Sequence, residues 1–351
     1  MITVYSVDEQ NKWDSIVNSF ERYDVYYLNG YVKAFQLHGD GIPLLLYYNS
    51  GQLRGINVVM KRDIADDIHF DGIIEKNRVF DLATPYGYGG WYFEGEKSEQ
   101  LVASFTKEYL GWCIENSIVS EFVRFHPILN NAHGVNKDYY DISLIGNTVA
   151  IQLDSPESIW ENFSSKNRGH IRKAIKSGVQ VERSYSEAAF NTFVSIYEAT
   201  MQRDEAAEYY YFDKAFYDSV RNDLQNNGML FTAYFEGVPI AASIMLFAGK
   251  CLNYHLSGQL FDYRKYAGTS LVLFEAARWG YENGFTTLHL GGGVGAQPGP
   301  LYEYKKSFNA KGDDYHFYIG KRIISYGVYS DLCRMRSIDD STCGFFPAYR
   351  Q

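Results

Sequence analysis

Three strand patterns in a row, followed by a helix pattern and a fourth strand, constrain the fold of this chain most strongly. Apolar residues fill segments 229–235, 238–247 and 251–256, and turn residues at 236–237 and 249–250 separate them. A helical period then begins at Gly268 and ends at Gly284, and a strand pattern follows at 286–290. Further helices are expected at 155–163, 168–177, 187–201 and 212–225, with a short strand at 179–183. This mixture predicts a mixed α/β (α+β) fold.

The first half of the chain carries shorter strand patterns. They cover residues 25–28, 42–48 and 53–60, with turn chemistry at 49–51, and we interpret them as a meander-like sheet. A helix is expected at 98–116 with Ser98 as its cap, and strands at 122–125 and 149–153. Turn residues at 154–156 and a length of 351 residues predict two domains, 1–150 and 151–320. The segment 321–351 is expected to pack back on the first domain.

Composition limits the partners of the protein. With 33 Lys and Arg against 42 Asp and Glu, the net charge is -9, which disfavours wrapping of DNA and requires any polyanion site to be local. The four cysteines are scattered and lack metal-ligand spacing, so we expect no metal and a reducing, cytoplasmic location. The start of the chain has no signal-peptide pattern, and the longest apolar run, residues 240–249, is too short to span a bilayer. Stable membrane insertion is therefore not expected.

The most uneven local charge lies at residues 164–176. Five Lys or Arg and no carboxylate occur between Glu161 and Glu182, within a chain of negative net charge. Arg168, Arg172 and Lys173 could therefore contact the phosphates of a nucleotide, of coenzyme A or of a tRNA end. The alternative is an ordinary solvated helix face.

Two glycine-containing turns are also candidates for ligand contact. Arg264, Gly268 and Thr269 lie where the third strand pattern gives way to a helix, and a small-residue turn at a helix N-terminus can bind a pyrophosphate. The alternative is a plain strand-to-helix connection capped by Thr269 or Ser270. Further along, the end of a strand is followed by four glycines within residues 291–295, which include Gly292 and Gly293. Because glycine has no side chain, the backbone there could approach a ligand closely.

His255 is the candidate general base. Strand alternation would place Asn253, His255 and Ser257 on one face and Tyr254 on the other, so His255 could point into a cleft. The alternative is a hydrogen-bonded, half-buried histidine with no role in catalysis.

Four segments resemble the Fem-type (FemABX) peptidoglycan bridge aminoacyltransferases and related N-acyltransferases of the GNAT superfamily. They read PYGYGG at 85–90, FVRFHP at 122–127, SKNRGHIRKA at 165–174 and LYEYKKSF at 301–308, and the resemblance covers nearly the whole chain. It implies two tandem GNAT-like domains with a substrate cleft between them. It also implies an amine nucleophile and a donor that is aminoacyl-tRNA in the Fem enzymes and acyl-CoA in other relatives.

The resemblance also implies roles for individual residues. Lys305 matches the lysine of the F-K-x-x-F-G segment of the family and would stabilise the tetrahedral oxyanion. Tyr86, Tyr88 and Tyr302 would line the substrate site, with Arg168, Arg172 and Lys173 against the phosphates of the acceptor. The chain departs from the family pattern at Asn309-Ala310 and at His289, where the Fem enzymes usually carry Gly and Asp.

The function expected from these features is amide formation. A cytoplasmic N-acyltransferase would move an acyl or aminoacyl group from acyl-CoA or aminoacyl-tRNA to an amine of a peptidoglycan, nucleotide-sugar or other glycan precursor. The 3′ end of tRNA would be a partner if the donor is aminoacyl-tRNA. One alternative is an acetyl-CoA-dependent N-acetyltransferase of a nucleotide-linked amino sugar. Another is a non-catalytic protein that binds a glycan or a nucleotide.

Overall fold

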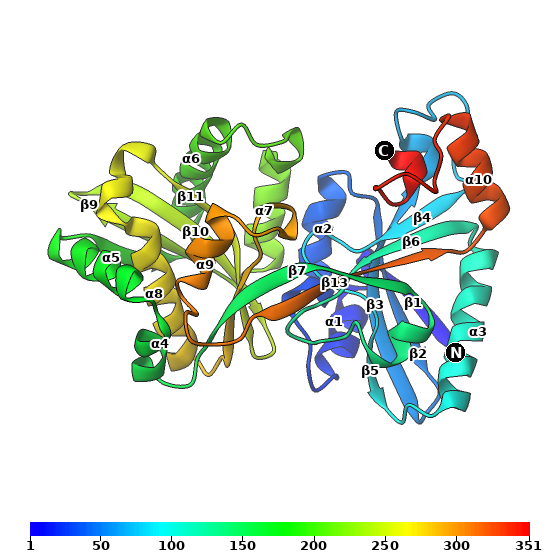
Figure 1. The fold of residues 1–351 in the computed structure, drawn as a ribbon, viewed down its shortest axis with the longest axis horizontal. Coiled ribbons are helices and arrows are strands. Elements are labelled where there is room, and N and C mark those ends of the chain that lie inside the picture. Colours follow the sequence, from blue (N-terminus) through cyan, green and yellow to red (C-terminus); the bar gives the residue numbers. More distant parts are fainter. The chain divides into compact units, whose positions relative to one another are not determined.

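The computed structural model describes residues 1–351, which form two compact units (Figure 1). Unit 1 consists of Met1–Glu21, Tyr26–Ile145 and Phe317–Gln351. Unit 2 consists of Arg22–Val25 and Gly146–His316. Both units are therefore assembled from segments that lie far apart in the sequence.

Unit 1 is built on a sheet with the strand order β1-β2-β3-β4-β6-β13, in which β5 also pairs with β3. Strands β1 to β4 are antiparallel neighbours, β4 and β6 run parallel, and β13 returns antiparallel to β6. The strands are β1 Ile2–Ser6, β2 Ile42–Asn49, β3 Leu53–Asp63, β4 Phe80–Ala83, β5 Tyr92–Gly95, β6 Ile118–Arg124 and β13 Tyr315–Ile323. The predicted β2–β3 hairpin is confirmed, with register pair Asn49↔Arg54 next to the turn.

Four helices complete unit 1, and only the third of them along the chain was predicted. They are α1 Gln10–Asn18, α2 Asn29–Leu37, α3 Glu99–Glu115 and α10 Tyr326–Met335. The predicted strand at 25–28 is wrong, since Val25–Tyr27 forms a 3₁₀ turn that leads into α2. A short apolar run cannot be assigned to strand or buried helix from periodicity alone. Helix α3 lies where it was predicted, but Ser98 makes no side-chain capping hydrogen bond.

Unit 2 has a sheet with the order β7-β12-β11-β10-β9-β8. Only β11 and β12 are parallel, and the other neighbours are antiparallel. The strands are β7 Asp141–Gln152, β8 Gln180–Ser184, β9 Gly228–Phe235, β10 Val238–Ala248, β11 Cys251–Gln259 and β12 Thr287–Gly291. The predicted run of three strands, a helix and a fourth strand is confirmed.

Helices cover the sheet of unit 2 on both faces (Figure 1). Helix α8 packs on β9, β10 and β11 together with α4 and α5, whereas α6 and its neighbour α7 lie on the other face. The helices are α4 Pro156–Asn162, α5 Ser165–Lys176, α6 Glu187–Arg203, α7 Lys214–Asp223, α8 Gly268–Glu282 and α9 Pro300–Lys306. Val272 and Ala276 of α8 are fully buried, and they share a core with Leu252 of β11 and Leu288 of β12.

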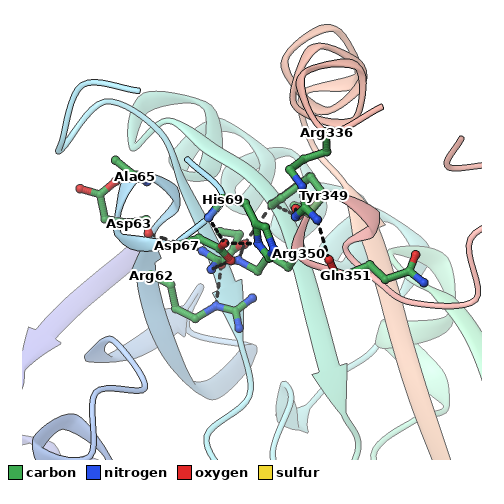
Figure 2. A network of polar contacts seen from close by, with 11 residues as sticks. Arg62, Asp63, Ala65, Asp67, His69, Arg336, Tyr349, Arg350 and Gln351 are labelled. Carbon is green, nitrogen blue, oxygen red and sulfur yellow. Dashed lines mark hydrogen bonds and ion pairs between the residues drawn. The ribbon is translucent and has the colours of Figure 1, made fainter. Parts of the chain in front are cut away.

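The last residues of the chain are held in unit 1 by a polar network, shown in Figure 2. The fully buried Asp81 carboxylate accepts from Arg62 Nε at 2.6 Å, the Tyr349 hydroxyl at 3.0 Å and Arg350 Nε at 2.5 Å. Arg350 also pairs with Asp67 at 3.1 Å. A buried carboxylate needs such partners, because leaving it unpaired costs several kcal/mol.

We expect Arg350→Met to destabilise the fold by about 2 to 4 kcal/mol, since it removes one guanidinium from the buried Asp81 and leaves Arg62 as the remaining cation. The midpoint of urea unfolding measures this loss. Arg334→Met is the matched control, because Arg334 and its partner Asp331 are both exposed, and it should change stability by no more than about 0.5 kcal/mol. Equal midpoints for the two variants would contradict this account of the network.

Candidate functional site

A pocket of about 510 Å³ lies in unit 2, where β11 ends and α8 begins. Residues from α5, α6, β11, α8 and α9 form its walls. The lining residues are His170, Lys173, Thr200, Arg203, Tyr254, Ser257, Gly258, Gln259, Arg264, Lys265, Ala267, Thr269, Ser270, Leu301 and Tyr304. This volume is in the range of small-molecule and cofactor sites.

The pocket lining is cationic. Lys173, Arg203, Arg264 and Lys265 contribute to its wall, and no Asp or Glu does. Arg203 is partly neutralised by the adjacent Asp204, at 2.7 Å, whereas Lys173 forms no ion pair. In a chain with a net charge of -9, this local excess of positive charge attracts an anion.

The first turn of α8 adds backbone donors to the pocket. The helix begins at Gly268 after Ala267, whose φ is +55°, and no side chain caps it. The N–H groups of the first turn have no acceptor within the helix. The Thr269 hydroxyl in the same turn is buried and has no hydrogen-bond partner. Free N–H groups at the positive end of a helix form an anion-binding site.

A β-bulge at His255 shapes the strand side of the pocket. Ile244 pairs with Leu256 and the next residue, Met245, pairs with Tyr254, so His255 is the extra residue in β11. The predicted alternation is therefore wrong beyond this point, because one inserted residue reverses the faces. Tyr254 and Ser257 both reach the pocket, and the Tyr254 hydroxyl donates to Ser257 Oγ at 2.6 Å.

The pKa of His255 reflects its surroundings. His255 does not line the pocket, and burial lowers its pKa to about 3. The imidazole is therefore neutral at physiological pH, but it is a weak base.

Lys305 lies beside the glycine-rich loop. Its ammonium donates to the Gly292 carbonyl at 2.7 Å, and burial lowers its pKa to about 8. Lys305 itself does not line the pocket, although its helix neighbours Leu301 and Tyr304 do. The side chain is half-buried and carries no carboxylate partner.

Gly292 and Gly293 are required by the backbone around them. A Cβ at Gly293 would lie 2.2 Å from the Gln297 carbonyl, and a Cβ at Gly292 would lie 3.0 Å from that of Asn147. The loop therefore folds tightly against its own chain.

The basic side chains of residues 164–176 point to two places, the pocket and helix α4. Lys173 and His170 line the pocket. Arg168 instead donates to the Glu161 and Phe163 carbonyls at the end of α4, and Arg172 lies over the Trp160 ring at 5.1 Å. Lys173, Arg264 and Thr269 are thus brought together at one pocket, with Gly268 in the helix turn between them.

The three tyrosines expected at the substrate lie in separate surroundings. The Tyr302 hydroxyl donates to the Asp314 carboxylate in unit 2. Tyr86 and Tyr88 lie in unit 1, where the Tyr86 ring stacks on Phe35 at 5.5 Å and the Tyr88 ring meets that of Phe317 at 5.1 Å. Neither Tyr86 nor Tyr88 belongs to the pocket of unit 2.

Several pocket residues were not predicted from the sequence. Arg203 is the last residue of α6 and reaches the pocket from 61 positions before Arg264, a proximity that no local pattern reveals. Tyr254 and Ser257 both reach the pocket because of the bulge at His255. Tyr304 lies within the 301–308 motif, which was the available signal for it. No cluster of three or more His, Cys, Asp or Glu side chains could hold a metal ion, and no helix is long and apolar enough to cross a membrane.

Comparison with known proteins finds a family match for the part of the chain that contains the pocket. The model of the acetyltransferase (GNAT) domain family matches residues 162–306, a range that contains every lining residue of the pocket. A curated relative, the lipid II:glycine glycyltransferase of Staphylococcus haemolyticus, is 32% identical over 114 residues. That alignment covers 32% of this chain and 26% of the relative, so the chain matches about a quarter of the length of that protein.

Solved structures match nearly the whole chain. The crystal structure of FemX superposes with a TM-score of 0.68 at 13% identity, covering 94% of this chain and 99% of FemX. A conserved protein of unknown function from Bacteroides thetaiotaomicron gives a TM-score of 0.60 at 7% identity, over 92% of this chain and all of that one. At such identities the likeness concerns the fold, and it confirms the predicted mixed α/β class.

We expect Gly293→Ala to destabilise the protein by about 1 to 3 kcal/mol, because the added methyl group would collide with the Gln297 carbonyl. Thermal unfolding measures this effect. Gly299→Ala is the matched control, since a Cβ there meets nothing within 4 Å and the backbone is extended. If both variants have the same midpoint of thermal unfolding as the unchanged protein, Gly293 is not packed against the Gln297 carbonyl.

Proposed function

We propose that this chain is an enzyme of the Fem-type GNAT family and that it transfers an acyl or aminoacyl group from a phosphate-bearing donor to an amine of a cell-wall or surface-glycan precursor. One observation carries the proposal. The pocket of unit 2 joins an uncapped helix N-terminus, a buried unpartnered hydroxyl and four cationic side chains, with no carboxylate in its lining. All of these residues lie in the segment that matches the GNAT domain.

The donor is proposed to place its phosphates against the first turn of α8. Its N–H groups and the Thr269 hydroxyl would donate to phosphate oxygens, while Lys173 and Arg264 would supply positive charge. Acyl-CoA and the 3′ end of aminoacyl-tRNA share this phosphate chemistry. Both are cytoplasmic molecules, so the proposed reaction is a cytoplasmic one.

The acceptor is proposed to be an amine on a peptidoglycan precursor. Support comes from the curated relative, whose name assigns it glycine transfer to lipid II. A nucleotide-linked amino sugar is the alternative acceptor, and it would accompany acetyl-CoA as donor.

The proposed chemistry needs a cation and a proton acceptor. The amine attacks the donor carbonyl, and an ammonium such as that of Lys305 stabilises the oxyanion that develops. Collapse of this intermediate expels the thiol or the ribose hydroxyl of the donor and leaves the amide. The proton released by the amine would pass to a carboxylate of the acceptor itself, because His255 does not line the pocket and burial makes it a weak base.

Lys173→Met should weaken donor binding about tenfold, because it removes one charge-assisted contact to a phosphate. Isothermal titration with acetyl-CoA, with CoA and with an aminoacylated tRNA measures this loss and identifies the donor. Lys176→Met is the control, since Lys176 is also an exposed lysine of α5 but does not line the pocket. If neither donor class binds at millimolar concentration, or if both variants lose affinity equally, the donor site is wrong.

Lys305→Met should lower kcat by about 10²- to 10³-fold without a matching change in donor affinity, since a cation beside a developing oxyanion acts mainly in the transition state. With a pKa lowered to about 8, the Lys305 ammonium is present below that pH and is lost above it, so kcat should fall as pH rises past about 8. Lys305→Arg should move this decline to higher pH. An unchanged pH profile in the arginine variant would remove Lys305 from the mechanism. Donor binding with no turnover of any acceptor by the unchanged protein would favour a non-catalytic role.

A further inference from the structure

Unit 1 contains a second pocket, of about 320 Å³, that the proposed acyl transfer does not use. It lies among the end of β13, the start of α10 and the segment 340–346, outside the residues that match the GNAT domain. Tyr326, Phe345 and Phe346 form its aromatic walls, and Asp141, Asp340, Lys321 and Arg322 contribute its charges.

The aromatic walls present ring surface to solvent. Tyr326 is 71% exposed and Phe345 is 51% exposed, which is unusual for large apolar residues placed together. Phe346 is fixed behind them, since its ring stacks on that of Tyr329 at 6.0 Å, and Tyr329 is buried. The pocket therefore combines two exposed aromatic residues with one whose ring packs on the buried Tyr329.

The charges of this pocket are balanced and available. Asp141, Asp340 and Lys321 line it without forming any ion pair. Arg322 donates to the Tyr139 carbonyl at 2.8 Å, whereas the Lys321 ammonium forms no ion pair and lies 5.8 Å from the centroid of the Phe346 ring. Two carboxylates beside two cations leave this pocket without the excess of positive charge found in the pocket of unit 2, and carboxylates repel a phosphate.

We propose that this pocket binds a sugar residue of a glycan. A pyranose ring has a face of C–H groups that packs on the negative face of an aromatic ring, and hydroxyls at its edge that both donate and accept. The exposed rings of Tyr326 and Phe345 would receive the C–H face, the two carboxylates would accept from hydroxyls, and Lys321 would donate to a ring or hydroxyl oxygen. This inference stands on unit 1 alone and does not require that the chain be an acyltransferase.

Cys343 provides a reporter for the test. It lines the same pocket, and it is the single cysteine of the four that is not buried. A ligand in the pocket should therefore slow its alkylation by iodoacetamide, which mass spectrometry of the full-length protein can follow at residue 343.

The experiment titrates chitotriose and maltotriose against the rate of Cys343 alkylation. We expect saturable protection by at least one trisaccharide, and a loss of affinity of at least about fivefold in Tyr326→Ala. Tyr326→Phe should keep the protection, because the ring remains. Tyr281→Ala is the control, since Tyr281 is an exposed tyrosine of unit 2 and its loss should leave protection unchanged.

Separate arms with inorganic phosphate and with glycine test the other ligand classes. Protection by phosphate or glycine, together with no protection by either trisaccharide, would overturn the proposal. An alkylation rate that neither trisaccharide slows at millimolar concentration would also overturn it. Equal protection in the unchanged protein and in Tyr326→Ala would also overturn it. Thermal unfolding of each variant establishes that it is folded before titration. Loss of acyl transfer in the Lys305 variants has no bearing on this result.

Discussion

The contact between the first turn of α8 and strand β10 determines where the candidate site of unit 2 can form. A Cβ at Gly268 would lie 3.0 Å from Ile240 Cδ1 and 3.3 Å from the Ala241 side chain, so a larger residue there would press the start of the helix away from the sheet. Ala267 turns the chain into the helix with a φ of +55°. The uncapped N–H groups and the Thr269 hydroxyl are oriented by this packing, and the cationic side chains are arranged around them.

Net charge and local charge describe different properties of this protein. The chain as a whole carries a charge of -9, yet the unit 2 pocket has four Lys or Arg and no carboxylate in its lining. The unit 1 pocket combines exposed aromatic residues with two carboxylates, one lysine and one arginine. Ligand class therefore follows from what each wall presents and not from the overall composition.

The elements of unit 2 could be predicted because their periodicity is strong and local. Strands β9, β10 and β11 and helix α8 lie close to the expected ranges, and Gly268 and Thr269 were placed correctly at a helix start. The bulge at His255 could not be predicted, since one extra residue in a strand leaves the apolar pattern readable and reverses only the faces beyond it. The place of Arg203 in the pocket wall could not be predicted either, because it results from tertiary packing of α6 and not from a local sequence pattern.

The basic run shows the same limit at the level of single side chains. The positive charge of this segment could be predicted from the sequence. Which of its side chains reach the pocket could not, because Arg168 donates to carbonyls at the end of α4 and Arg172 lies over the Trp160 ring of that helix. In unit 1, helices α1, α2 and α10 were not predicted, and the short apolar run at 25–28 was assigned to a strand because such a run suits a strand or a helical turn equally well.

The segmented composition of unit 1 has a consequence for synthesis on the ribosome. Residues 146–316 of unit 2 are made before Phe317–Gln351, which supply β13 and the partners of Asp81 to unit 1. Until those residues emerge, β6 has an unpaired edge and the Asp81 carboxylate lacks Tyr349 and Arg350. An open strand edge is a site for mispairing with other chains. The unit that is translated first is therefore the unit whose sheet and buried ion pairs are completed last.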